Sequence, residues 1–152
     1  MPTSVKHRVS YEEDLYAWSQ EQAALLRARR TEGLDWGNLA EEIAVVRRNE
    51  RRELESRLCV ILLHLLKWQG QPELRGASWR QTLRTQRREI RKLLEQSPSL
   101  RRHVPELVGS AYPDAVKDAV DETGLTAERF PAECPYAPDD VLAEAYLPEA
   151  SF

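Results

Sequence analysis

The sequence predicts an all-α fold: a helical bundle of about four main helices, with one long central helix and an extended C-terminal arm packed across it. Three observations support this prediction. Apolar residues recur at spacings of three and four along most of the chain. Proline, glycine and helix-capping residues separate these periodic stretches into segments. No stretch of useful length alternates apolar and polar residues as a half-buried strand does.

A capping box at Ser10 and Glu13 predicts a first helix from Ser10 to about Arg30. In such a box each side chain accepts a hydrogen bond from the backbone N–H of the other residue. Gly33 interrupts the helical pattern. The predicted apolar face consists of Tyr11, Leu15, Trp18, Gln22, Leu25 and Leu26.

The second helix is the longest, from a cap near Asp35 to about Trp68. It contains no proline, and its only glycine, Gly37, falls in the first turn. At about 100° per residue its apolar side chains form one stripe about nine turns long. The second half of the stripe is apolar nearly all round, which predicts the buried centre of the bundle. The stripe consists of Trp36, Leu39, Ile43, Val46, Leu54, Leu58, Ile61, Leu65 and Trp68.

Two more helices complete the predicted bundle. A third helix from Trp79 to about Gln96 follows Ser78, which is a favourable N-cap residue. A fourth helix, from Leu100 to Thr123, contains Pro113 in its interior, which predicts a kink or a restart. Pro105 suits a first helical turn if this helix begins late, and Gly124 is a typical residue at a helix C-terminus.

Residues 10–148 are predicted to form a single helical domain, with the bundle at about 10–124 and the arm at about 125–148. Residues 1–9 and 149–152 are predicted to be tails. No apolar run approaches the roughly 20 residues that a membrane span needs. The first ten residues contain no apolar core of a secretory signal. We therefore expect a cytoplasmic protein with no membrane association.

The formal net charge of −3 hides an uneven distribution. Residues 71–102 hold 9 Lys and Arg against 3 Asp and Glu, whereas residues 103–152 hold 2 against 11. Such asymmetry is typical of a surface that binds nucleic acid or an acidic partner. It is equally expected of two parts of one fold that attract each other.

Eight short strings in fixed order resemble a bacterial family abundant in cyanobacteria, domain of unknown function family 29. The resemblance runs from about residue 10 to residue 148 and implies an all-helical fold with no established activity. Members of that family usually have an uninterrupted, charge-rich helix where this chain has His103-Val104-Pro105 and Ala111-Tyr112-Pro113. The strings are YEEDLYAW at 11–18, NLAEEI at 38–43, RRELESRL at 51–58, LLHLLKWQ at 62–69, SWR at 78–80, QRREI at 86–90, SPSL at 97–100 and FPAECPY at 130–136.

The first candidate site is polar and lies on the long helix. Glu50, Arg57 and His64 are seven residues apart, so they fall on one side of the helix, within or beside the apolar stripe. Glu53 lies four residues before Arg57, the favourable order for an ion pair. A carboxylate on a buried stripe needs a partner. The site is either a carboxylate and imidazole pocket between helices, or a structural Glu–Arg pair with a core histidine bonded to a neighbouring helix.

The second candidate site is a basic stripe on the third helix. Around the helix, Arg84, Arg87 and Arg91 lie within about 40° of Arg80. Arginines at this density could follow a nucleic-acid backbone. Alternatively, the acidic segment 103–152 neutralises them and their apolar stems cover the core.

Catalytic signatures are missing from the sequence. No His is preceded at three residues by Glu, as helical carboxylate metal sites require. The sequence also lacks a Gly-x-Ser-x-Gly elbow and a Gly-rich phosphate loop. Cys59 and Cys134 have no metal-ligand spacing. We therefore predict no catalytic residues, no metal and no cofactor.

These observations favour a non-enzymatic protein-interaction or binding module whose partner is another protein or a second copy of the chain. One alternative is a nucleic-acid-binding accessory protein that uses the arginine stripe. Another is an enzyme or ligand-binding protein with a site at Glu50, Glu53, Arg57 and His64.

Overall fold

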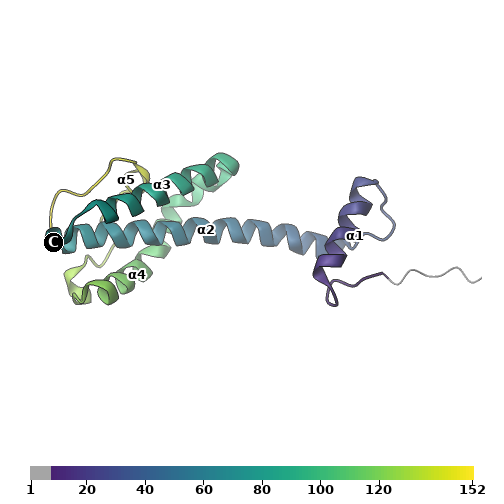
Figure 1. Ribbon diagram of the computed structural model, residues 1–152, viewed down its shortest axis with the longest axis horizontal. Coiled ribbons are helices and arrows are strands. Elements are labelled where there is room, and N and C mark those ends of the chain that lie inside the picture. The colour runs from purple at the N-terminus through teal and green to yellow at the C-terminus, as the bar shows by residue number, and fades with distance from the viewer. Residues whose placement is uncertain (1–7) are drawn as a thin grey trace, which may run out of the picture. The chain divides into compact units, whose positions relative to one another are not determined.

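The computed structural model in Figure 1 describes residues 8–152, so most of the predicted N-terminal tail 1–9 lies outside the described residues. The described residues form helices and no strand, which confirms the predicted all-α fold. None of these helices combines the length and the apolar character needed to cross a membrane. The α-helices are α1 (Leu15–Arg27), α2 (Trp36–Gly70), α3 (Ala77–Gln96), α4 (Val104–Thr123) and α5 (Pro138–Leu142).

The chain divides into two compact units, Met1–Arg48 and Asn49–Phe152, and the boundary lies inside α2. The first unit contains α1 and the beginning of α2. The second contains the rest of α2 and all later elements. The helix is continuous across this boundary, but residues 47–53 (RRNERRE), which are all polar or charged, interrupt its apolar stripe there.

In the N-terminal unit, α1 is shorter than the predicted Ser10–Arg30 helix. Its N-cap is Asp14, whose carboxylate accepts a hydrogen bond from the backbone N–H of Ala17 at 2.9 Å. Ser10 does accept from the N–H of Glu13 at 3.2 Å, but this bond closes a turn before the helix. The helix ends at Arg27, because Arg29 adopts a left-handed φ of 54°.

Three polar side chains hold α1 against the start of α2. The indole Nε1 of buried Trp18 donates to the Asp35 carboxylate at 3.1 Å. Gln22 accepts from the N–H of Asp35 at 2.8 Å and donates to the carbonyl of Gly33 at 3.2 Å. The Tyr11 hydroxyl donates to the Glu42 carboxylate at 2.5 Å. The two helices therefore form a hairpin with a fixed turn.

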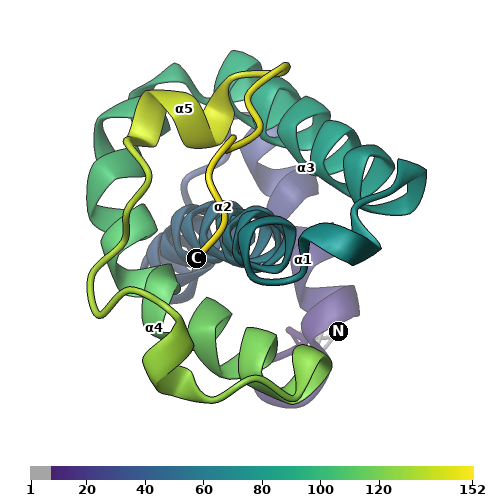
Figure 2. The same cartoon turned by 90° about the vertical axis from the view of Figure 1, so that its left-hand side faces the viewer.

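In the C-terminal unit, α3, α4 and α5 surround α2, as the end-on view in Figure 2 shows. The apolar side chains of α2 from Leu54 to Trp68 are buried, apart from Cys59 and Val60, which are partly exposed. This confirms the predicted centre of the bundle. The first half of the same stripe differs: Trp36, Ile43 and Val46 are 63%, 72% and 60% exposed. Only one half of the apolar stripe is therefore covered.

The ends of α3 and α4 depart modestly from prediction. Helix α3 begins at Ala77 after Gly76, and residues 98–103 form a 3₁₀ turn, so α4 starts late with Pro105 in its first turn. Pro113 does not break α4. The carbonyl of Gly109 that loses its partner lies on the exposed side, where water can bind it. Gly124 ends α4 with a left-handed φ of 71°, as predicted.

The arm and the last residues pack on the bundle. Phe130, Tyr136 and Val141 are buried in the core. The predicted tail 149–152 is anchored on Gln69, which donates to the carbonyl of Ala150 at 2.8 Å and whose own carbonyl accepts from Phe152 N–H at 3.2 Å. These residues close over the end of α2.

We expect Leu62→Ala to lower the free energy of unfolding by about 2–5 kcal/mol, because it leaves a cavity at a fully buried position. Leu74→Ala is the matched control, since Leu74 is 56% exposed in the same unit, and a change below about 0.5 kcal/mol is expected. Urea denaturation measures both. Equal effects of the two substitutions would contradict the assigned core.

Candidate functional site

The four residues of the predicted polar site on α2 do not meet in one pocket. Glu50 and His64 are fourteen residues apart on a continuous helix, which separates them by about 21 Å along its axis. Glu50 instead binds the end of α3: its carboxylate accepts from the Ser97 hydroxyl at 2.5 Å and from the Gln96 amide at 3.3 Å. Glu50 therefore links α2 to the end of α3.

Glu53 and Arg57 are brought together, in the predicted i, i+4 order, at 3.0 Å. Arg57 also donates to the side-chain carbonyl of Gln86 on α3 at 3.2 Å. These three residues and Val60 line a shallow groove of about 490 Å³. The pair is partly exposed to solvent, so its contribution to stability is below about 1 kcal/mol.

His64 is half-buried, and its Nδ1 lies 2.8 Å from the carbonyl oxygen of Val60. The partner is thus in the preceding turn of α2 rather than on a neighbouring helix. Burial lowers the pKa of the His64 imidazole. A neutral ring that donates its Nδ1–H to this carbonyl accounts for both observations.

The four arginines of the predicted basic stripe have four different environments. Arg80 lies over the Trp68 ring, 5.0 Å from its centroid, and Arg84 is exposed. Arg87 is buried and donates to the carbonyls of Val141 at 3.0 Å and Glu144 at 3.2 Å. Arg91 lies 3.5 Å from the Glu144 carboxylate. The structure does not present the four side chains as one exposed band.

The acidic C-terminal third pairs chiefly with α2 rather than with α3. Arg51 contacts Glu106 at 2.5 Å and Lys67 contacts Glu122 at 2.6 Å, so both pairs join α2 to α4. Arg91 is the one member of the predicted basic stripe with an ion pair to this third among the described residues. The charge asymmetry of the sequence is thus only partly neutralised between α3 and the arm.

Cys59 lies beside an acidic group of side chains, with its Sγ 3.9 Å from the Asp118 carboxylate. Burial and the nearby carboxylates Asp118, Asp114 and Glu55 raise the pKa of the Cys59 thiol to about 11. A protonated thiol is a weak nucleophile. In the described part of the chain, no group of three His, Cys, Asp or Glu side chains is arranged to hold a metal ion.

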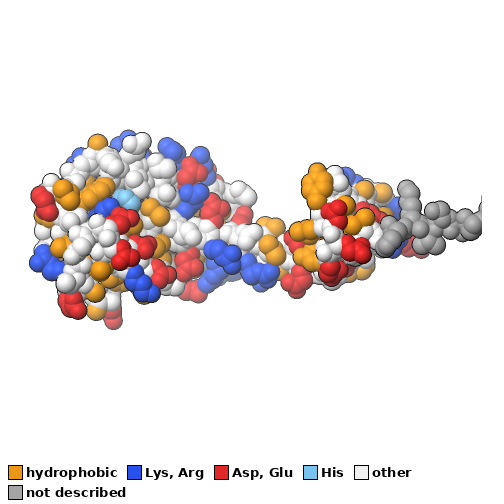
Figure 3. Space-filling model, turned by 60° about the horizontal axis from the view of Figure 1, so that its bottom comes forward, with side chains coloured by type: hydrophobic (Ala, Val, Ile, Leu, Met, Phe, Trp, Pro, Cys, Tyr) orange, Lys and Arg blue, Asp and Glu red, His pale blue; other side chains and the backbone are white. Residues whose placement is uncertain are grey.

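An apolar groove in the N-terminal unit is the feature that our sequence reasoning missed. It has a volume of about 620 Å³ and lies between α1 and α2, with Leu15, Ser19 and Leu26 on one side and Leu39 on the other. Figure 3 shows hydrophobic side chains at the surface of this unit, among acidic ones. The large hydrophobic residues exposed here are Leu15 (50%), Tyr16 (74%), Leu26 (49%), Trp36 (63%), Ile43 (72%) and Val46 (60%).

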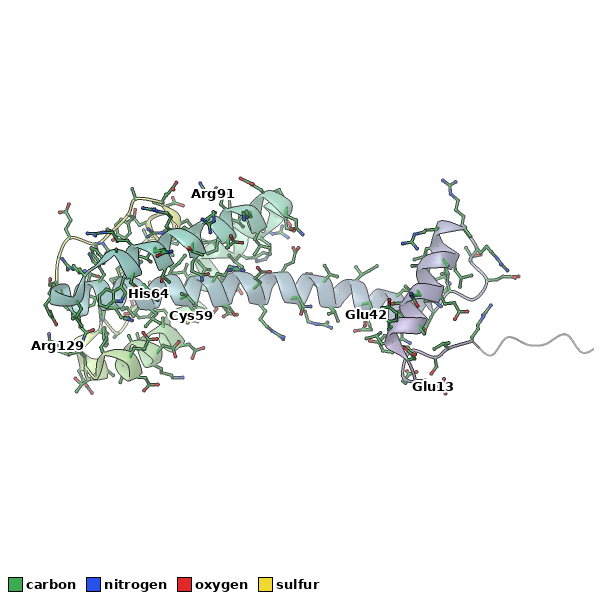
Figure 4. The ribbon with its side chains drawn as sticks, in the orientation of Figure 1. Glu13, Glu42, Cys59, His64, Arg91 and Arg129 are labelled. Carbon is green, nitrogen blue, oxygen red and sulfur yellow. The ribbon has the colours of Figure 1, made fainter. Side chains whose placement is uncertain are left out.

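Opposite charges flank the two ends of α1. Glu12, Glu13 and Asp14 precede the helix, and Figure 4 shows Glu13 and Glu42 at this same end of the unit. Arg27, Arg29 and Arg30 follow at the other end, where Glu32 is the nearest carboxylate in the turn. All seven charged residues named in the 12–32 segment are exposed. Helix α1, which forms one side of the apolar groove, therefore has acidic residues before one end and basic residues at the other.

The model of the family described as Domain of unknown function DUF29 matches residues 10–147. The chain belongs to this family. The resemblance seen in the sequence strings is thereby confirmed over nearly the whole chain. No curated protein and no solved structure matches the chain. The DUF29 description names no ligand, partner or reaction.

We expect the Cys59 thiol to resist alkylation in the folded DUF29 protein. With a pKa of about 11, its thiolate fraction at pH 8 is on the order of 100-fold below that of an ordinary cysteine. Iodoacetamide labelling of a Cys134→Ser variant, followed by mass spectrometry with and without denaturant, measures this ratio. Asp118→Asn should speed the reaction. A folded rate equal to the denatured rate would show that the thiol is not shielded.

We also expect His64 to make stability depend on pH. Its pKa is lowered in the folded state, so below the unfolded pKa of about 6.5 the unfolded state binds more protons. Stability from this source is complete above that value and decreases as the pH falls from 7.5 to 5.5. Urea denaturation of His64→Leu should show a smaller decrease than the wild type, whereas His103→Leu retains the His64 contribution. A pH dependence of stability in His64→Leu equal to that of the wild type would disprove the contribution of His64.

Proposed function

We propose that this DUF29 protein is a protein-interaction module that self-associates through the apolar groove of its N-terminal unit. One observation supports this most strongly. Of the eight large hydrophobic side chains exposed in the described chain, six belong to α1 and the first half of α2. The other two, Leu74 and Phe152, lie elsewhere. A gathering of exposed hydrophobic residues in one small unit is typical of an interaction surface.

The arrangement of these side chains suits a helical partner. On α2, Trp36, Leu39, Ile43 and Val46 are spaced by three, four and three residues, as in a seam between packed helices. Within the N-terminal unit, Trp18 of α1 and Tyr11 before it contact Asp35 and Glu42. Trp36, Ile43 and Val46 of the seam stay largely exposed, so they are available to apolar side chains, as in helix-in-groove recognition.

The distribution of charge favours a second copy of the chain as the occupant. A twofold-symmetric contact must be complementary to itself. When α1 packs antiparallel to α1 of a second copy, Leu15 lies opposite Leu26 of that copy, and Asp14 opposite its Arg27. The acidic end of each α1 then faces the basic end of the other. A parallel arrangement would place like charges together, which is unfavourable.

The other two functions have less support. The nucleic-acid alternative needs Arg80, Arg84, Arg87 and Arg91 on one accessible surface, yet Arg87 is buried against the arm. The ligand-site alternative needs Glu50 close to His64, yet these two residues are several turns apart.

We expect the wild-type protein to be a dimer at micromolar concentration in size-exclusion chromatography with light scattering. Leu26→Glu or Ile43→Glu should raise the dissociation constant at least tenfold, because each places a charge in the apolar contact. Leu74→Glu is the matched control, since Leu74 is exposed outside the N-terminal unit. A monomeric wild type that instead binds a different protein through this groove would overturn the assignment of a second copy.

A charge exchange tests the antiparallel arrangement. Arg27→Glu with Arg30→Glu should weaken the dimer, because carboxylates then face carboxylates. Adding Glu12→Lys and Glu13→Lys to the same chain should restore it. Failure of the four-residue variant to recover dimerisation, while it remains folded by circular dichroism, would argue against this arrangement.

A further inference from the structure

A second and smaller pocket lies in the C-terminal unit, between α3 and the arm. Its volume is about 210 Å³. Arg87, Arg91 and Arg101 line it together with one carboxylate, Glu144. The remaining lining residues are apolar: Ile90, Leu94 and Leu142. The pocket therefore combines three guanidinium groups with an apolar floor.

Arg87 is the unusual member of this group. It is only 5% exposed, and the acceptors of its Nε and Nη1 are the neutral carbonyls of Val141 and Glu144. Its Nη2 is the one buried side-chain nitrogen or oxygen without a partner among the described residues. A buried cation bonded only to neutral acceptors is costly unless an anion compensates it. The desolvation is strong enough to lower the pKa of Arg87.

The hydrogen bonds of Arg87 to two backbone carbonyls explain part of its burial. The two carbonyls belong to the end of α5 and the residues after it, so Arg87 also fastens the arm to α3. That role uses two of the three guanidinium nitrogens. It leaves Nη2 unexplained, and it does not require two further arginines around the same pocket.

Arg91 and Arg101 leave the pocket with an excess of positive charge. Arg91 pairs with Glu144 at 3.5 Å, but both side chains are more than half exposed, and such a pair contributes little. Arg101 is exposed. Three cations thus face a single weakly held carboxylate, which a more highly charged anion can displace.

We propose that this pocket binds a small phosphate monoester. The phosphate group lies between Arg87, Arg91 and Arg101, because guanidinium groups bind phosphate oxygens through paired N–H donors. The organic part packs on Ile90, Leu94 and Leu142. Typical pockets for drug-sized ligands begin at about 300 Å³, so a volume of about 210 Å³ suits one phosphate with a small organic group.

Binding measured with phenyl phosphate, with inorganic phosphate as the second probe, tests this proposal. Titration calorimetry at constant ionic strength should give saturable binding of phenyl phosphate, and weaker binding of inorganic phosphate, which lacks the apolar part. The double variant Arg91→Ala, Arg101→Ala should bind phenyl phosphate at least tenfold more weakly. Arg84→Ala with Arg88→Ala is the matched control, because it removes two exposed charges from α3 outside the pocket.

Glu144→Gln provides a readout that a purely structural role for Arg87 would not change. Removing the competing carboxylate should tighten phenyl phosphate binding several-fold. The proposal is overturned by the absence of saturable binding, by equal losses in the pocket and control variants, or by inorganic phosphate binding as tightly as phenyl phosphate. These results are independent of the oligomeric state, so they do not bear on self-association.

Discussion

The burial of the apolar side chains of α2 between Leu54 and Trp68 is the constraint on which the rest of the structure depends. This part of α2 is apolar nearly all round, so it is stable in water only when several elements cover it. Helices α3 and α4 and the arm provide that cover, and their own buried residues face α2. The ion pairs Arg51–Glu106 and Lys67–Glu122 join α4 to α2 at the margin of this core.

The same constraint separates the two halves of α2. Its first half continues the apolar stripe with Trp36, Ile43 and Val46, but the N-terminal unit offers only the thirteen residues of α1 to cover it. Trp18 and Gln22 are the only fully buried members of α1. A hairpin with so few buried contacts gains little from packing, and an isolated helix of this length is marginal in water. Covering the groove would therefore stabilise this unit as well as bind a partner.

Much of the fold follows from local sequence signals, whereas the candidate sites depend on contacts between distant segments. The absence of proline and of glycine beyond its first turn correctly predicted the long helix α2, and Gly124 correctly marked the end of α4. Both signals are local, because proline and glycine act through their own backbone conformation. The predicted start of α1 was wrong because Ser10 and Asp14 are both favourable N-cap residues, and Asp14 is the one that caps the helix. Periodicity placed Glu50 and His64 on one side of α2. It could not show which residues of other segments would contact them. Nor could it show which half of the stripe would be covered.

Arg87 shows that arginines equivalent in a sequence pattern can have different environments in the fold. Seen along the sequence, Arg80, Arg84, Arg87 and Arg91 are equivalent positions on one face of a helix. In the fold, the arm closes over that face at Arg87 and leaves Arg84 exposed. Closing the arm removes water from the Arg87 guanidinium group and replaces it with only two carbonyls, so one positive charge of the stripe is enclosed. An anion in the adjacent pocket would compensate the buried charge of Arg87 and would strengthen the hold of α3 on the arm, because both act through the same side chain.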